Sequence, residues 1–433
     1  MDSNRARSTG WCLALAFVGM SGFFAVCRGR PAQAQNPPSA AESENATVSI
    51  RDVHSPHCLL HTDLSPCESD VLVERLETML KIVSNYWARP MRGVLECHVV
   101  RNLDDYPMEC MAPLGIRKVK MAGGATLMQM SFEGNRRVLK SVVVASTRPE
   151  VVYHEAIHAY CFQTFGHIGP VWYSEGMAEM GHYWKEGDVS VRADPREIEF
   201  LRAWQPKSIA ELVAAKQVSG DSWQNYAKRW SLCHFLVFNP TYAKQFRQLG
   251  QGFLAGKDVG FDRTFGAVLR PLFFDYLFFL NHIDQGYRVD LCAWDWSKKF
   301  ISLQPGRVQT ATISAGLGWQ PTGLAIRAGT QYDYLAAGTW RVAGSPEAMD
   351  AGGDNQGRGR LVGVLMKDCQ LGDEFELGPQ GLLDLKSEGD LYLRCRNDWN
   401  RLAGDCGRIA VNFKLSGQGP PLQEPEAKDS DTQ

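Results

Sequence analysis

The residues best suited by type and spacing to carry out chemistry lie in the stretch 151-VVYHEAIHAYCFQTFGHIGPVWYSEGMAE-179. His154 and His158 are four residues apart, so on a helix both imidazoles project from the same face and can bind one metal ion. Glu155 follows the first histidine directly and projects beside the pair. This spacing is the one that a zinc hydrolase needs, because zinc binds imidazole nitrogen readily.

Two carboxylates in the second half of the stretch extend the pattern. Glu175 and Glu179 are again four residues apart. A catalytic zinc takes three protein ligands and keeps one position for water, so Glu175 is the expected third ligand after the two histidines. Glu179, one turn further along, is placed to accept a hydrogen bond from a ligating histidine and so orient its ring.

Two helices are expected to position these side chains. Thr147 followed by Glu150 predicts the capped start of the first helix, and Gly166 predicts its end. Glycine and proline residues then break the chain, and the segment 171-VWYSEGMAEMGHYW-184 predicts a second helix that returns past the first. The two helices would bring the histidines and the glutamates to one place.

These motifs resemble those of the gluzincin metallopeptidases, the group that contains thermolysin and the zinc aminopeptidases. The resemblance rests on HEAIH at 154–158 and WYSEGMAE at 172–179. More narrowly, the chain is similar to exported bacterial gluzincins in which a Y-A-x-x-W-x-L-x-x-F-L helix follows, here 226-YAKRWSLCHFL-236. The similarity spans roughly residues 90 to 290 and implies an α+β fold with a zincin-like metallopeptidase domain, a small sheet plus helices.

The resemblance implies zinc-assisted hydrolysis of peptide bonds. Glu155 would act as the general base, taking a proton from the attacking water and passing it to the leaving amine. A donor should also stabilise the tetrahedral oxyanion. Tyr226 is the first candidate because it opens the downstream helix, with ordinary aromatic packing as the alternative, and His234 is the second.

The periodicity of apolar residues predicts further helices and strands between residues 65 and 250. Ser65 as N-cap and Glu68 three residues later predict an amphipathic helix over 65–87. Short β-like runs then predict a sheet before the HEAIH helix, namely 94–100, 124–130 and 138–146. The run 124–130 is either an edge strand that a bound substrate extends by β-augmentation or an interior strand. Helices are expected farther on, at 208–216, 226–238 and 241–250.

Composition limits the kind of partner. The 433 residues predict two folded units, and the balance of 46 Lys and Arg against 48 Asp and Glu argues against docking on nucleic acid. The N-terminal apolar run ending in Ala32-x-Ala34 predicts a secretory signal peptide and hence a secreted or periplasmic protein with no stable membrane span after cleavage. The alternatives are an uncleaved membrane anchor and a lipoprotein attached at Cys27.

The cysteines predict disulfides. Twelve cysteines occur, of which ten follow residue 34, and an even number in an exported chain is typical of disulfide pairing. Cys58 with Cys67 and Cys97 with Cys110 are the close pairs, and for Cys161, which lies within a helix, a buried thiol is the alternative. The histidines around Cys58 match no ligand scheme, so a disulfide loop with surface histidines is expected there.

The C-terminal part has an all-β pattern of short strands and turns. The segments 316–342, 361–365, 389–398 and 404–413 resemble the small calcium-dependent galactose-binding bacterial lectins, which are β-sandwiches. The resemblance implies an oxygen-ligated Ca2+ site with Asp398 as one ligand. The 404-GDCG-407 turn has Asp405, but it also has Cys406 where an oxygen ligand is expected. Cys406 can instead pair with Cys369 or Cys395, and a structural or protein-contacting sandwich is the alternative.

The predicted organisation is, in order, a signal peptide (1–34), a linker (35–46), a gluzincin-like metallopeptidase domain (47–303), a lectin-like β-sandwich (304–417) and a disordered tail (418–433). The predicted function is that of a secreted zinc peptidase acting on a peptide or protein, with the sandwich docking it to a glycan or cell surface. The alternative is a catalytically inactive cell-surface or glycan-binding protein built on a metallopeptidase scaffold.

Overall fold

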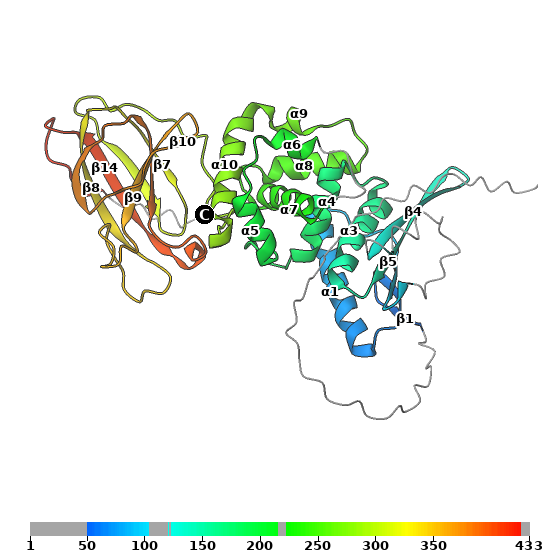
Figure 1. Ribbon diagram of the computed structural model, residues 1–433. Coiled ribbons are helices and arrows are strands. Elements are labelled where there is room, and N and C mark those ends of the chain that lie inside the picture. The colour runs from blue at the N-terminus through cyan, green and yellow to red at the C-terminus, as the bar shows by residue number, and fades with distance from the viewer. Residues whose placement is uncertain (1–49, 104–119, 121–122, 215–221, 426–433) are drawn as a thin grey trace, which may run out of the picture. The chain divides into compact units, whose positions relative to one another are not determined.

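The structure is a computed structural model that describes residues 50–103, 120, 123–214 and 222–425 (Figure 1). The predicted signal peptide and linker therefore lie outside the described residues, as does Cys110. The described residues contain no helix that is both long and apolar enough to cross a membrane.

The chain divides into two compact units. Unit 1 runs to Gly187 and includes residues 210–233 and 247–259, and unit 2 comprises residues 188–209, 234–246 and 260 onward. Unit 2 thus contains the strand-rich C-terminal part. It also contains helical segments that were predicted to belong to the metallopeptidase domain (47–303).

The elements up to Tyr183 belong to unit 1 and alternate between strands and helices. They are β1 (Arg51–His54), β2 (Cys58–Thr62), α1 (Pro66–Trp87), β3 (Leu95–Val100), β4 (Gly124–Glu133), β5 (Arg136–Ser146), α3 (Pro149–Phe165) and α4 (Val171–Tyr183). The helices that follow are α5 (Pro195–Ala203), α6 (Ile209–Val213), α7 (Trp223–Phe238), α8 (Ala243–Leu254), α9 (Phe261–Phe265) and α10 (Leu269–His282).

The sheet of unit 1 has the strand order β1-β2-β3-β5-β4. The pairs β2–β3 and β3–β5 are parallel, whereas β1–β2 and β4–β5 are antiparallel. The three strands predicted from the sequence are confirmed. Among the described strands β4 is the last of this sheet, so 124–130 has the predicted edge position and not the interior one.

The strands β1 and β2 were not expected, because this segment was predicted to be a disulfide loop. In β2 the side chains of Cys58, Leu60 and Thr62 are buried and the two between them are partly exposed. This alternation of period two is the signature of a strand with one buried face. The prediction of a loop is therefore wrong.

Helix α1 connects β2 to β3. The N-terminal cap predicted from Ser65 and Glu68 is confirmed. The Ser65 hydroxyl accepts from the Glu68 backbone N–H, and Glu68 accepts from the Ser65 backbone N–H. The apolar face of α1 is buried, with Leu76 and Val83 fully inaccessible. A helix between two parallel strands is the usual crossover of a βαβ unit, and here it extends the sheet from β2 to β3.

Helix α3 packs against β4 and β5, and α4 packs against α3 (Figure 1). Gly166 ends α3 in the left-handed conformation, with φ 90°, as predicted. The predicted cap at Thr147 is wrong, because Arg148 is the N-cap residue, without a side-chain hydrogen bond, and Pro149 is the first helical residue. Proline there needs no N–H partner, so the helix can start without a capping side chain.

In unit 2 the C-terminal strands form two antiparallel sheets. Their orders are β10-β9-β13-β7, with β11 also pairing β9, and β12-β8-β14-β6. The strands are β6 (Gln309–Ser314), β7 (Gln320–Ile326), β8 (Gln331–Arg341), β9 (Leu361–Lys367), β10 (Gln370–Leu371), β11 (Phe375–Glu376), β12 (Gln380–Asp384), β13 (Gly389–Cys395) and β14 (Cys406–Leu415).

Both sheets contribute to one apolar core. Residues of the first sheet, such as Leu361 and Leu393, cluster with residues of the second, such as Ile409 and Phe413. Two sheets sharing a core in this way form a β-sandwich. The chain as a whole therefore contains both helices and sheets, consistent with the predicted α+β class.

The cysteines of the described residues are all free thiols, nine in number. The predicted Cys58–Cys67 disulfide is wrong, because Cys58 is buried in β2 while Cys67 is exposed on α1. Cys406 is likewise free and exposed, so the suggested bridge to Cys369 or Cys395 is also wrong. Cys161 is a buried thiol, which was the alternative to pairing, and burial raises its pKa.

Candidate metal centre

The helical spacing of His154 and His158 brings their two rings together on α3. The Nε2 atoms lie 3.1 Å apart, and the ring centroids lie 4.9 Å apart in an edge-to-face arrangement. Both side chains are almost completely buried. Two imidazole nitrogens therefore point to one place inside the protein.

Helix α4 adds the Glu175 carboxylate to the pair. Its Oε2 atom lies 3.3 Å from His154 Nε2 and 3.6 Å from His158 Nε2. Ligands about 2.0–2.1 Å from a tetrahedral metal ion are separated from one another by about 3.3 Å. The three atoms therefore stand at the separations that such an ion imposes on its ligands.

The Glu175 Oε2 atom is buried and accepts no hydrogen bond. Unsatisfied buried acceptors are rare in proteins, and a cation between the carboxylate and the two imidazoles would satisfy this one. Burial raises the pKa of the Glu175 carboxyl, but His158 and His154 offset this effect and leave it below its usual range. The residue thus offers a carboxylate, and two nitrogens with one carboxylate oxygen make a donor set that zinc accepts.

The outer nitrogens of the two rings also have partners on α4. Glu179 Oε1 lies 3.0 Å from His154 Nδ1, and Ser174 Oγ lies 3.1 Å from His158 Nδ1. Such contacts hold each ring with its Nε2 turned inward. Glu179 was predicted for this position from its spacing. Ser174 was missed, because a lone serine in a helix carries no distinctive signal.

Two glycines explain how α4 comes so close to its neighbours. A Cβ atom on Gly176 would lie 2.6 Å from the backbone oxygen of Arg229 on α7 and 2.5 Å from Cys233 Sγ. A Cβ atom on Gly181 would lie 2.6 Å from Ile157 Cγ1 on α3. The absence of side chains at these positions lets α4 approach both helices, which is needed for Glu175 to reach the histidines.

Glu155 is buried next to the edge strand β4. The Thr126 hydroxyl oxygen lies 2.8 Å from Glu155 Oε2 and 2.7 Å from the Glu155 carbonyl oxygen. Burial raises the pKa of the Glu155 carboxyl, although the nearby His154 and His158 lower it in part. A carboxyl group with a raised pKa beside a candidate metal centre is suited to taking up and releasing a proton.

The two candidate oxyanion donors have different surroundings. The ring of Tyr226 stands edge-on to the His154 ring, with centroids 5.8 Å apart. The ring of His234 lies 4.9 Å from that of Phe238 and stacks 5.8 Å from that of Phe279. Burial lowers the pKa of His234 to about 3, so its ring is neutral at pH 7. Tyr226 is thus in contact with a candidate ligand, His154.

The predicted calcium ligands of the sandwich have other contacts. The Asp405 carboxylate accepts from Asn397 Nδ2 at 2.9 and 3.0 Å and from the Ala343 backbone N–H at 2.6 Å. Asp398 has its side chain 69% exposed and pairs with Arg401. Within the described part of the sandwich, no three His, Cys, Asp or Glu side chains converge as metal ligands do. The Asp405 carboxylate joins the segments around Ala343 and Asn397 through these hydrogen bonds.

No protein-family model matches the chain, and no curated protein matches it. Among solved structures the chain is similar to one described as "EclA N-terminal domain; PllA-like lectin". The similarity is weak, with a TM-score of 0.22 and 16% sequence identity, and it covers 25% of this chain and 96% of that chain.

Proposed function

We propose that the protein is an exported zinc-dependent peptidase of the gluzincin type. The observation that carries the proposal is the convergence of His154 Nε2, His158 Nε2 and Glu175 Oε2 within 3.6 Å of one another in the protein interior. Export rests on the N-terminal sequence alone.

A bound zinc ion would lower the pKa of a water molecule to about 7 and polarise the carbonyl group of the peptide bond to be cleaved. His154, His158 and Glu175 would hold the ion. Glu179 and Ser174 would keep the two imidazole rings in the orientation that binding requires, through the contacts at their Nδ1 atoms.

Glu155 would accept the proton of the attacking water on its carboxylate and deliver it to the nitrogen of the departing amine. Its burial supports this role, because a raised pKa makes the Glu155 carboxylate a stronger base than a carboxylate in water, so it takes the proton of the attacking water more readily. Thr126 would orient the carboxylate through its hydroxyl group.

The edge strand β4 suggests how a peptide could lie beside the site. None of the strands that the structure describes pairs with its outer edge, and an extended substrate can bind such an edge through backbone hydrogen bonds. Because Thr126 of this strand contacts Glu155, a peptide paired with β4 would run close to the general base. Tyr226, next to His154, is then the proposed donor to the oxyanion.

The test is to measure zinc content and casein cleavage for the wild type, Glu155→Gln and His158→Ala. The proposal expects Glu155→Gln to retain zinc and lose about 10²–10⁴-fold in cleavage rate. His158→Ala should lose both zinc and activity, because it removes a ligand. A wild type that binds zinc but cleaves neither casein nor a peptide library would instead favour an inactive binding protein.

A further inference from the structure

A second group of potential metal ligands lies on the sheet of unit 1. The parallel register of β2 and β3 places His61 directly opposite His98. Glu96 is two residues before His98, so its side chain projects from the same face of the sheet. The βαβ connection through α1 thus brings His61 next to Glu96 and His98, which are far from it in the sequence.

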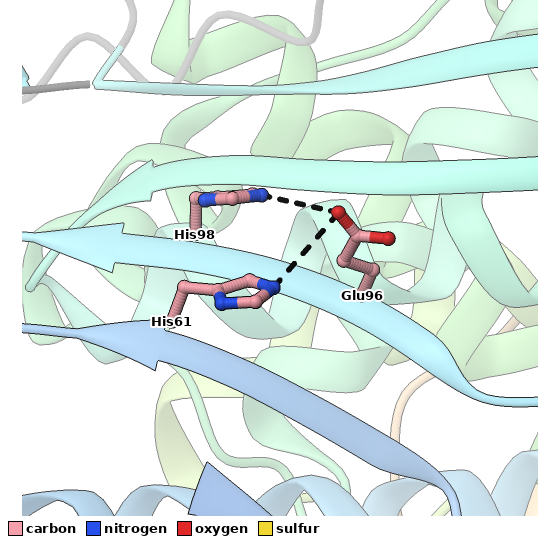
Figure 2. A group of neighbouring side chains, drawn as sticks. All are labelled: His61, Glu96 and His98. Carbon is pink, nitrogen blue, oxygen red and sulfur yellow. Dashed lines mark hydrogen bonds and ion pairs between the residues drawn. The ribbon is translucent and has the colours of Figure 1, made fainter. Parts of the chain in front are cut away.

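One carboxylate oxygen faces both imidazoles, as Figure 2 shows. Glu96 Oε1 lies 3.2 Å from His98 Nε2 and 3.9 Å from His61 Nε2. The two rings stack with centroids 4.4 Å apart and planes 21° apart. One ligand atom from each of the three residues lies within 4.8 Å of the others, a spacing at which three side chains can hold a single ion.

The second atoms of two of these side chains are already held by other groups. His61 Nδ1 lies 2.7 Å from Asp52 Oδ1 of β1, which leaves Nε2 directed at Glu96. Lys140 on β5 forms an ion pair with Glu96 Oε2 at 2.7 Å, which leaves Oε1 to the histidines. Contacts of this kind orient a histidine and a carboxylate in metal sites.

We propose that His61, Glu96 and His98 bind a second divalent transition-metal ion of the zinc class, independently of the candidate metal centre on α3 and α4. Two imidazoles and a carboxylate are suitable ligands for such an ion. All three side chains are partly exposed, with 18 to 25% of each accessible, so solvent can reach the remaining coordination position. A bound ion would link β2 to β3 and so stabilise the packing of the β1–β2 hairpin against the rest of the sheet.

The competing explanation is a hydrogen-bonded surface cluster that takes no ion. In it, His98 donates to Glu96, and Lys140 neutralises the carboxylate. The two explanations differ in whether the histidines are needed for metal uptake, and this can be measured without any assay of peptidase activity.

The experiment uses the full chain, stripped of metal with a chelator, and titrates it with Zn2+ by calorimetry. The wild type should bind about two zinc ions per chain and His61→Gln and His98→Gln about one each. His158→Ala, which removes a ligand of the other site, should bind about one, and its Tm should rise when zinc is added. The proposal is overturned if neither His61→Gln nor His98→Gln lowers the number of zinc ions bound.

His57→Gln is the matched control. His57 lies in the turn between β1 and β2 and pairs with Glu77 through Nδ1 at 2.7 Å, so it is a neighbouring histidine with a carboxylate partner outside the cluster. This variant should bind as much zinc as the wild type. An equal loss of zinc in His57→Gln and His61→Gln would indicate non-specific binding to surface histidines and would also overturn the proposal.

A milder substitution covers the case in which a histidine variant does not fold. Asp52 is 56% exposed and contacts His61 only at the nitrogen away from Glu96. Asp52→Asn should therefore leave the sheet intact and weaken zinc binding at the second site by about 10–100-fold. Unchanged affinity in a folded Asp52→Asn protein would count against the proposed ligand set.

Discussion

The Thr126 hydroxyl of strand β4 lies within hydrogen-bonding distance of both the Glu155 carboxylate and the Glu155 carbonyl oxygen on helix α3, at 2.8 and 2.7 Å. This contact connects the edge of the sheet to the residue proposed as general base. Both side chains are buried, so the carboxylate has little water to solvate it and depends on this donor.

Replacing Thr126 by valine should lower kcat/KM for a peptide substrate by about tenfold, the equivalent of one lost hydrogen bond to a charged group. Valine preserves the shape of the side chain but cannot donate a hydrogen bond. Zinc content should not change, because Thr126 contacts no candidate ligand in the metal centre. Thr126→Ser keeps the hydroxyl and should retain most of the activity. Equal activity in the Val and Ser variants would contradict the orienting role.

Glu179→Gln should weaken zinc binding at the candidate metal centre by about 10–100-fold, because the carboxylate beside His154 Nδ1 holds that ring and increases its basicity. The measurement is competition with a chelator of known affinity, carried out in His61→Gln so that the other proposed site does not contribute. Glu186→Gln is a control, since Glu186 is an exposed residue paired with Lys81. If Glu179→Gln and Glu186→Gln bind zinc equally well, Glu179 does not support the ligand.

Tyr226→Phe should reduce kcat by about 10²–10³-fold with little change in KM, because an oxyanion donor acts chiefly in the transition state. Phenylalanine preserves the edge-on packing against His154 and removes only the hydroxyl. A variant with wild-type kcat would mean that Tyr226 serves in packing. His234→Gln, tested alongside, would then decide whether the second candidate supplies the donor.

Gly176→Ala should destabilise unit 1 by about 1–3 kcal/mol, the range for overpacking a close contact. The added Cβ would stand 2.6 Å from the backbone oxygen of Arg229, which cannot move away as a flexible side chain can. Urea denaturation gives the measurement. Gly266→Ala is the control, because a Cβ there meets no atom within 4 Å. Similar stabilities for the two variants would show that α4 and α7 are not in close contact.

The stability of unit 2 should depend on pH through Asp275. Burial raises the pKa of this carboxyl from 3.8 to about 8, even though Tyr242 and Trp296 donate to it. The folded protein therefore retains a proton that the unfolded chain releases above pH 3.8. This contribution to stability is fully present below about pH 4 and decreases as the pH rises from about 4 to about 8, by roughly 6 kcal/mol in total.

Asp275→Asn should remove that part of the pH dependence, because the amide does not ionise. Urea unfolding of both proteins at pH 5 and pH 8.5 measures it, and the difference between the wild type and the variant cancels the other titrating groups. A wild type whose stability changes no more than that of Asp275→Asn would mean that the carboxyl titrates normally.

Much of the candidate metal centre was predictable because its parts are local. The spacing of His154 and His158 requires only a helix, and Gly166 ends that helix where expected. The start of the helix was less predictable. Thr147 is a typical N-cap residue, but Pro149 allows the helix to begin after Arg148 without a capping side chain. Strands β1 and β2 were not predicted, because they are only four and five residues long and their histidines and cysteine are equally compatible with a surface loop.

The amino-acid sequence by itself predicted the two helices of the candidate metal centre and which of their faces carry imidazoles and carboxylates, because these properties depend on residues within one or two turns of each other. Only the tertiary structure decided that Glu175 reaches His154, that Thr126 reaches Glu155 and that His61 stands opposite His98. Those relationships depend on helix contacts and strand register, which are set by packing between segments far apart in the chain.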